Sequence, residues 1–278
     1  MSLKINDING RLENLRKYFN CNQMAAIEYA FFNLEIRQAE KILDKNIPAH
    51  YMSLYAILMK NGIPVDQFIA EGYHADEIRC EEIDKIYMQL KKFNKKMKEL
   101  EENGKYSNEQ LMALKEAYKI IGQQVYLLID SNISSEYIAK YATLIKGGIS
   151  VKKFIGEGYH LNETKKGEID SAYEQVQEFN DTIDQIRKVG KMNEQQIIAL
   201  EEAFAQIGKN AYILANYTIP SEYIRKYTYL LENCVDISDF IFSESHLSAE
   251  GQSEIDALYN ETITANADKT LRITRPSA

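Results

Sequence analysis

The sequence predicts an all-α protein built from tandem helical repeats, and three observations support this fold class. Only 13 Gly and 4 Pro occur among 278 residues, and runs rich in Leu, Ile, Lys, Glu, Gln and Ala favour helices. A segment of 29 residues that begins at Asn46 recurs at Asn132 and Thr218, each time after 86 residues. Apolar residues are spaced by three and four, and no run alternates as a half-buried strand would.

The recurring segments are too similar to match by chance. The first and second share 16 of 29 residues, and the second and third share 11. Self-similarity at a fixed period is typical of stacked arrays, so we predict three modules of about 86 residues. The predicted boundaries are an N-terminal capping segment at 1–20, helical modules at 21–106, 107–192 and 193–260, the last one truncated, and a flexible C-terminal tail at 261–278 that lacks apolar periodicity.

The second copy defines the helices of one module. A first helix is predicted to run towards Gly122 and a second into the break at Gly147 and Gly148. A short helix and then a long one, from about Asn162 to Val189, follow them. The apolar stripes are, in chain order, Leu111, Leu114, Ala117, Tyr118 and Ile121; Tyr137, Tyr141, Leu144 and Ile145; Val151, Phe154 and Ile155; and Ile169, Tyr173, Val176, Phe179, Ile183 and Ile186.

Helix starts are marked by residues that differ between copies but keep one chemical role. A side chain that can accept a hydrogen bond from a first-turn amide precedes the long helix in every copy, at Asp76, Asn162 and Ser248. Similar residues precede the first helix, each followed three residues later by Gln at the capping-box spacing: Asn20, Ser107 and Asn193. Residues that suit the first turn of the second helix are Pro48, Ser134 and Pro220.

Neighbouring modules are expected to stack, because their apolar stripes are wider than a single partner helix would cover. We therefore predict an α-solenoid, with a three-lobed helical array as the alternative.

One pattern within the module resembles a known type of repeat. Gln-Leu-x-x-Leu-x-x-Ala-x-x-x-x-Gly-x-x-Val, from Gln110 to Val125, is similar to short helical-hairpin repeats of uncharacterised proteins from Gram-positive bacteria and their mobile elements. The second hairpin is similar in the same way, through Tyr137, Tyr141, Gly148, Val151 and Phe154. The resemblance implies a bacterial or phage accessory protein, and it implies no active site.

Charge and cysteine content narrow the function classes. A net charge of −8 argues against general affinity for nucleic acid or anionic membranes, and it is compatible with a basic partner. Cys21, Cys80 and Cys234 form no CxxC pair, which argues against a disulfide framework or a zinc knuckle and favours a reducing compartment. No stretch has the length of a signal-peptide core or a membrane span, so we expect a cytoplasmic protein.

Three histidines form the first candidate site. His74, His160 and His246 occupy one repeat position and could bind zinc if the modules closed into a ring. The interpretation we favour is that each packs over the break before the long helix, so we predict no metal. The candidate binding residues here are Tyr73, His74, Tyr159, His160 and His246.

A run of lysines forms the second candidate site. Its candidate binding residues are Lys91, Lys92, Lys95 and Lys96, with Lys98 nearby. The counterparts in the second copy are Gln177, Glu178, Asp181, Thr182 and Asp184. This difference excludes a nucleic-acid surface shared by all repeats, and leaves either a solvated helix face or one basic patch on the first module.

Two further patterns are interpreted as structural. The repeated Glu-Ile-Asp at Glu82, Glu168 and Glu254 lies near a helix start, where the helix dipole favours acids. A tyrosine ladder at i, i+4 belongs to the apolar stripe of the second helix: Tyr51, Tyr55, Tyr137, Tyr141, Tyr223 and Tyr227. P-loop, dinucleotide-binding, zinc-protease and nucleophile-elbow motifs are missing from the sequence, so we predict no enzyme and no cofactor.

The leading functional hypothesis is a non-enzymatic protein-interaction scaffold, adaptor or inhibitor that binds another protein. Its special case is a protein encoded by a phage or mobile element and directed at a basic nucleic-acid-handling host protein. The alternative is a metal- or small-molecule-binding protein, or an enzyme, that uses the repeated histidines. A third hypothesis is a nucleic-acid binder that uses the lysines of the first module. The sequence leaves the identity of the partner and the oligomeric state open.

Overall fold

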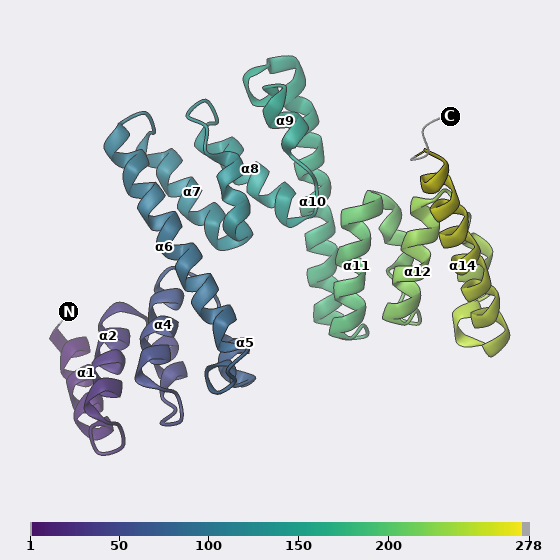
Figure 1. Cartoon of the computed structure of the whole chain (residues 1–278). Coiled ribbons are helices and arrows are strands. Elements are labelled where there is room, and N and C mark those ends of the chain that lie inside the picture. The colour runs from purple at the N-terminus through teal and green to yellow at the C-terminus, as the bar shows by residue number, and fades with distance from the viewer. Residues whose placement is uncertain (1, 274–278) are drawn as a thin grey trace. The chain divides into compact units, whose positions relative to one another are not determined.

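The computed structural model describes residues 2–273, and over that range it contains helices and no strands (Figure 1). The predicted all-α fold class is therefore confirmed, and the order of the elements repeats three times. Each repeat consists of a first helix, a 3₁₀ corner, a second helix, a short helix with a 3₁₀ turn, and a long helix. One further helix, α1 (Ser2–Leu15), precedes the first repeat.

The bounds of equivalent elements agree closely between copies. The first helices are α2 (Cys21–Asn33), α7 (Asn108–Ile121) and α11 (Glu194–Ile207). The corners are α3 with η1 (Ile36–Ala39, Glu40–Ile42), η3 (Gly122–Leu128) and η5 (Gly208–Leu214). The second helices are α4 (Ala49–Lys60), α8 (Ser135–Lys146) and α12 (Ser221–Glu232).

The second half of each module repeats as well. The short helices are α5 (Asp66–Ala70), α9 (Lys152–Gly156) and α13 (Ser238–Phe242). They lead into η2 (Tyr73–Ala75), η4 (Tyr159–Leu161) and η6 (Ser245–Leu247). The long helices are α6 (Cys80–Asn103), α10 (Glu163–Val189) and α14 (Ala249–Ile273).

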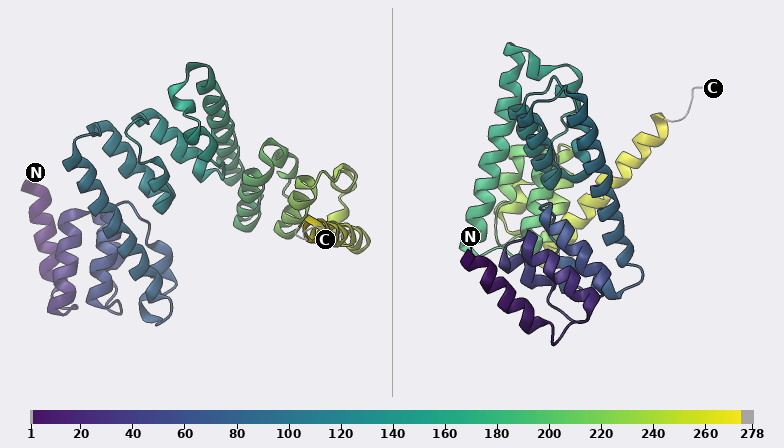
Figure 2. Two further views of the ribbon diagram at one scale, coloured as in Figure 1. Left: turned by 45° about the horizontal axis from the view of Figure 1, so that its top comes forward. Right: turned by 90° about the vertical axis from the view of Figure 1, so that its left-hand side faces the viewer.

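The chain folds into two compact units, Met1–Tyr126 (unit 1) and Leu127–Ala278 (unit 2). In unit 1, α2 lies between α1 and α4, and α6 contacts both α4 and α7 (Figure 1). In unit 2, α10 packs on α8, and α12 lies beside α11 and α14 (Figure 2). The boundary between units falls within the second sequence repeat, because the ring of Tyr118 on α7 stacks on Phe93 of the preceding long helix.

The helix caps follow the predicted chemistry. All three first helices begin with a complete capping box, at Asn20 with Gln23, Ser107 with Gln110, and Asn193 with Gln196. In the first and third copies the Gln amide also donates to two loop carbonyls, for instance those of Tyr217 and Ile219. The Gln therefore joins the start of the first helix to the start of the second, in addition to capping.

Three helix starts differ in detail from the prediction. Pro48 and Pro220 are the N-cap residues of α4 and α12, one position before the first turn. Asp76 accepts hydrogen bonds from the amides of Ile78 and Arg79, and so caps a turn that leads into α6, which begins only at Cys80. Asn162 caps α10 directly, as predicted.

The long helix α14 continues past Glu261 to Ile273, over residues for which we predicted a flexible tail. The prediction depended on missing apolar periodicity, whereas polar contacts hold this part of α14. The Asn266 amide donates to the hydroxyl of Tyr229 at 3.2 Å and to the side-chain oxygen of Asn233 at 2.6 Å, both on the α12 side. Residues 274–278 of the predicted tail lie outside the described residues.

Consecutive modules meet where a long helix packs on the next first helix. Phe93 stacks on Tyr118 with ring centroids 4.1 Å apart, and Phe179 stacks on Phe204 at 3.9 Å. Beside each stack, a glycine after the second helix adopts positive φ and touches the next first helix. A Cβ on Gly148 would lie 2.2 Å from the Cβ of Ala205, so only glycine fits there.

The third copy has lost this glycine. Cys234 occupies the repeat position of Gly62 and Gly148, keeps positive φ at 60°, and is exposed. Glu244 likewise has a φ of 51° where the earlier copies have Gly72 and Gly158. The backbone geometry of the module is therefore retained even where its residue is unfavourable.

Substitutions at the repeat position of Gly148 and Cys234 should change the stability of the fold in opposite directions. Gly148→Ala places a Cβ on a residue with left-handed backbone and also brings that Cβ too close to α11. Because both effects are unfavourable, it should destabilise the fold by about 3 kcal/mol. Cys234→Gly removes strain without adding a contact, so it should stabilise by up to about 1 kcal/mol. Urea denaturation followed by circular dichroism measures both values. Equal effects of either sign at the two positions would contradict the close approach of α11.

Candidate functional site

The three repeated histidines each bind a tyrosine of their own module. The hydroxyls of Tyr55, Tyr141 and Tyr227 lie 3.2, 3.1 and 3.4 Å from Nδ1 of His74, His160 and His246, respectively. In every pair the tyrosine precedes the histidine by 19 residues, and it lies on the second helix. The pair therefore ties the 3₁₀ turn before the long helix to the second helix.

Burial determines the protonation of these pairs. The three tyrosines have no exposed area, and burial raises the pKa of Tyr55 and Tyr227 to about 12. The phenols are therefore protonated at neutral pH and can donate to Nδ1, which leaves the proton of each neutral imidazole on Nε2. Burial also lowers the pKa of His160 and of His246, because the charged ring would lose its hydration.

The surroundings of the second ring nitrogen, Nε2, differ between the three histidines. Nε2 of His246 lies 3.3 Å from the hydroxyl of Thr218. Nε2 of His160 is buried without a hydrogen-bond partner among the described residues. His74 is partly exposed, whereas the other two histidines are buried. The middle copy therefore contains the costliest arrangement of the three.

The structure places most of the first candidate site in the interior. His160, His246 and Tyr159 are buried, and Tyr159 packs on Phe154 of the short helix with centroids 5.3 Å apart. Tyr73 packs in the same way on Phe68 and is only partly exposed. Over the residues that the structure describes, no group of three or more His, Cys, Asp or Glu side chains could hold a metal ion. The observed contacts of these residues are hydrogen bonds and ring contacts within their own modules.

The aspartates of the repeated Glu-Ile-Asp pair with the second helix. Lys140 Nζ lies 2.7 Å from Asp170, and Lys226 Nζ lies 2.6 Å from Asp256. The first copy has no lysine at this position, and His50 takes over at 3.8 Å from Asp84.

The lysines of the second candidate site lie on the outer face of α6. Lys91, Lys92 and Lys95 are exposed and form no ion pair with a described residue. Lys96 is partly buried and lies 3.6 Å from Glu99. The structure therefore places these four lysines along one helix, at the surface of unit 1.

Equivalent positions on α10 carry the opposite charge. We define the outer stripe as Met88, Lys92, Lys95 and Lys98 of α6 and, 86 residues later, Glu174, Glu178, Asp181 and Asp184 of α10. All eight side chains are exposed. Of the four acids, only Glu178 forms an ion pair with a described residue, at 3.9 Å from Lys209. The same surface of the module is therefore basic in one copy and acidic in the next.

The charge of the whole chain is distributed in the same sense. Residues 1–126 contain 18 Lys and Arg against 18 Asp and Glu, and residues 127–278 contain 15 against 23. The net charge of −8 therefore belongs to unit 2, a difference that the total does not reveal.

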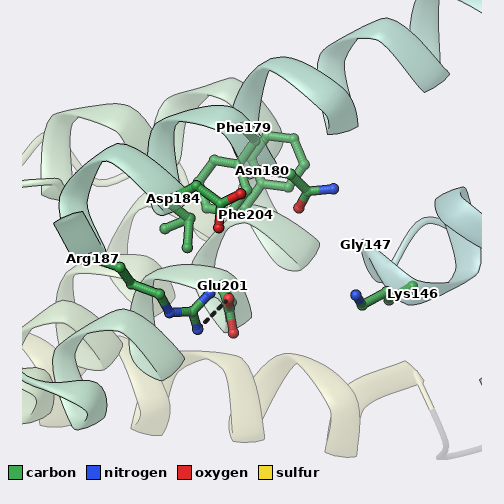
Figure 3. Close-up of a pocket in the computed structure, with 9 residues that line it drawn as sticks. Lys146, Gly147, Phe179, Asn180, Asp184, Arg187, Glu201 and Phe204 are labelled. Atoms are coloured by element: carbon green, nitrogen blue, oxygen red, sulfur yellow. Dashed lines mark hydrogen bonds and ion pairs between the residues drawn. The ribbon is translucent and has the colours of Figure 1, made fainter. Parts of the chain in front are cut away.

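A cavity recurs at the two module junctions. The one in unit 2 has a volume of about 260 Å³ and lies over the stacked Phe179 and Phe204 (Figure 3). The one in unit 1 has a volume of about 320 Å³ and lies over Phe93 and Tyr118. The two are lined by repeat-equivalent positions of the long helix, the second helix and the next first helix, so we call them junction cavities.

The rims of the two junction cavities differ in charge. In unit 2, Arg187 pairs with Glu201 at 3.2 Å on one side, and Lys146 lies on the opposite side (Figure 3). In unit 1, Lys115 replaces Glu201 and Lys119 replaces Ala205. The sequence does not predict these cavities, because their lining comes from three elements that only the packing brings together.

Comparison with known proteins supplied no relative: no protein-family model, curated protein or solved structure matched the chain. Among the described helices, none is both long and apolar enough to cross a membrane.

Removing the phenol of a tyrosine–histidine pair should test how much each pair stabilises the fold. Tyr141→Phe leaves both nitrogens of a buried histidine without partners, so it should destabilise by about 2–3 kcal/mol. Tyr55→Phe should cost about 1 kcal/mol, because His74 is partly exposed and water can replace the phenol. Urea midpoints of the two variants provide the comparison. A smaller loss for Tyr141→Phe than for Tyr55→Phe would contradict the difference in burial.

The buried histidines should also make stability depend on pH. Their pKa is lower in the folded chain than in the unfolded one, so the unfolded chain takes up protons first. Stability should be complete above the ordinary value of 6.5 and fall as the pH decreases below it, by at most about 1.4 kcal/mol per pH unit for each histidine. Denaturant titrations between about pH 7.5 and 5.5 measure this loss. His160→Gln should reduce it; an unchanged slope in that variant would contradict the assignment.

Proposed function

We propose that this chain is a non-enzymatic helical-repeat protein that binds another protein through the outer stripes of its long helices. The observation that supports the proposal is the reversal of charge at equivalent repeat positions of the two long helices. Lys92 and Lys95 of α6 correspond to Glu178 and Asp181 of α10, while the buried positions of the same helices remain apolar. Packing therefore constrains one face of the module, and the other face is left to vary with its partner.

The acidic stripe of α10 is the surface that we propose for the partner. Glu174, Asp181 and Asp184 form no ion pair with a described residue, although each is exposed on the same helix. Unit 2 carries the net negative charge of the chain, so its field attracts a positively charged surface and accelerates association. The proposed partner is accordingly a protein with a basic surface.

The resemblance to repeats of bacterial mobile elements suggests which kind of basic protein to test first. A nucleic-acid-handling host protein exposes a basic surface by necessity, and covering that surface would inhibit it. Three unpaired cysteines, two of them exposed, are compatible with the reducing cytoplasm in which such a target lies. Adaptor and inhibitor are both included in the proposal.

The proposal predicts that binding depends on the sign of one stripe. The triple variant Glu174→Lys, Glu178→Lys and Asp181→Lys reverses the acidic stripe without touching the buried face of α10. Basic proteins retained from a bacterial lysate by the wild-type chain should be lost by this variant. With the purified partner, calorimetry should show affinity at least about tenfold weaker, and weaker still at higher salt.

A matched control reverses the other stripe. Lys92→Glu with Lys95→Glu changes equivalent positions on α6 and should leave the affinity unchanged within about twofold. Circular dichroism and melting of both variants verify that the fold persists. Retention of the same basic proteins by the α10 variant, or equal losses in both variants, would contradict the proposed surface.

A further inference from the structure

We infer that the junction cavity of unit 1 is a binding site for a small anion that carries several phosphate groups. The site is separate from the acidic stripe of α10, and the inference does not depend on the proposed partner. It follows from a comparison that the chain itself provides, because the same cavity occurs twice with different rims.

The cavity is a defined part of the fold. Its volume of about 320 Å³ is at the lower end of the range of ligand sites. The stacked rings of Phe93 and Tyr118 lie at its base, and the side chains of Asn61 and Asn94 reach its wall. Neither ring is exposed by more than 5%, so the base is rigid and offers no face on which a ligand ring could stack.

Three lysines line this cavity, against one acid. Lys60 comes from the end of α4, and Lys115 and Lys119 come from α7, where Glu116 is the only acid among the described lining residues. Lys119 pairs with Glu116 at 2.6 Å, whereas Lys115 forms no ion pair with a described residue. The cavity is therefore left with an excess of positive charge.

Two lysines of α6 extend this charge beyond the lining residues. Lys91 and Lys98 lie three residues before and four after Asn94, which places them on the same side of the helix. The repeat equivalent of Lys98 is Asp184, which lines the cavity of unit 2. Glu101 stands where unit 2 has Arg187, and Lys98 pairs with Glu102 at 3.8 Å, so Lys91 is the one of these two lysines that forms no ion pair with a described residue.

The fold does not require these lysines. Unit 2 builds the same cavity over a stacked ring pair with Glu201, Ala205 and Asp184 at the equivalent positions. In unit 1, the lining residues Lys115 and Lys119 are four residues apart on α7, and like charges at this spacing destabilise a helix. An anion that both of them bind would explain this unfavourable pair.

The chemistry favours phosphate over carboxylate and a compact ligand over a polymer. None of the described residues that line the cavity is an arginine, whose planar fork would favour a planar anion held by two parallel hydrogen bonds, and lysine binds phosphate as a point charge. Three lysines line the cavity and Lys91 lies beside it, so several positive charges surround one site, which suits a triphosphate better than a single phosphate.

Calorimetry with sodium tripolyphosphate as the probe tests this inference on the full chain. Binding is expected at low salt, about 50 mM, and should weaken steeply as salt is added. The double variant Lys115→Glu with Lys119→Ala gives the cavity of unit 1 the residues found at the equivalent positions of unit 2. It should weaken binding at least about tenfold. Lys152→Glu with Lys188→Ala changes the net charge equally at exposed positions of unit 2, and should leave binding unchanged.

Glu201→Lys provides a second test, in which the junction cavity of unit 1 is left unchanged. It places a lysine at the rim of the cavity in unit 2 and should add a second, weaker binding event. The melting temperature of each variant shows whether it is folded.

Three results would overturn the inference. The first is no heat of binding to the wild-type chain at low salt. The second is equal weakening by the cavity variant and by the charge-matched control, which would indicate attraction by net charge alone. The third is a single-stranded DNA oligonucleotide that displaces the probe with an affinity rising with its length, which would make this surface a nucleic-acid site instead.

Discussion

The stacked ring pair at each junction is the contact on which the arrangement of the modules depends. Phe93 with Tyr118 and Phe179 with Phe204 join a long helix to the next first helix at centroid distances of 4.1 and 3.9 Å. A flat stack of two buried rings excludes water and fixes both helix faces. It can form only because the glycine beside it brings the end of the second helix within contact of the next helix. The junction cavities exist because these two contacts leave space between them.

Much of the fold could be predicted, since its signals are local in the sequence. Capping residues and apolar spacing fix where a helix starts and which face it buries, and Asn193 with Gln196 illustrates both. The helical residues beyond Glu261 could not be predicted, because Asn266 is held by Tyr229 and Asn233 rather than by an apolar stripe. The unit boundary depends on which ring stacks on which, and periodicity does not contain that information.

The candidate sites show the same division. The sequence revealed the repeated histidines and, separately, the tyrosine ladder, but not that Tyr141 and His160 form one hydrogen-bonded pair. The constant separation of 19 residues in all three copies was the available signal. The lysine run was visible in the sequence, whereas the cavity of unit 1 depends on the packing of the long helix, the second helix and the next first helix. Sequence repeats thus identify residues that recur, and only the packing shows whether those residues are inside or outside.

Differences between copies are the best guide to what the surface does. At the ring position of the long helix, α14 has the exposed Ala265 in place of Phe179, and Cys234 stands where Gly148 admits the next helix. Phe179 and Gly148 both contact the next first helix, so the third copy differs at two positions of the same junction. By the same reasoning, charges that change sign between α6 and α10 while the rings beneath them persist cannot be serving the fold. These charges keep their positions in the repeat but change sign, as expected if the two helices of one repeated scaffold bind different partners.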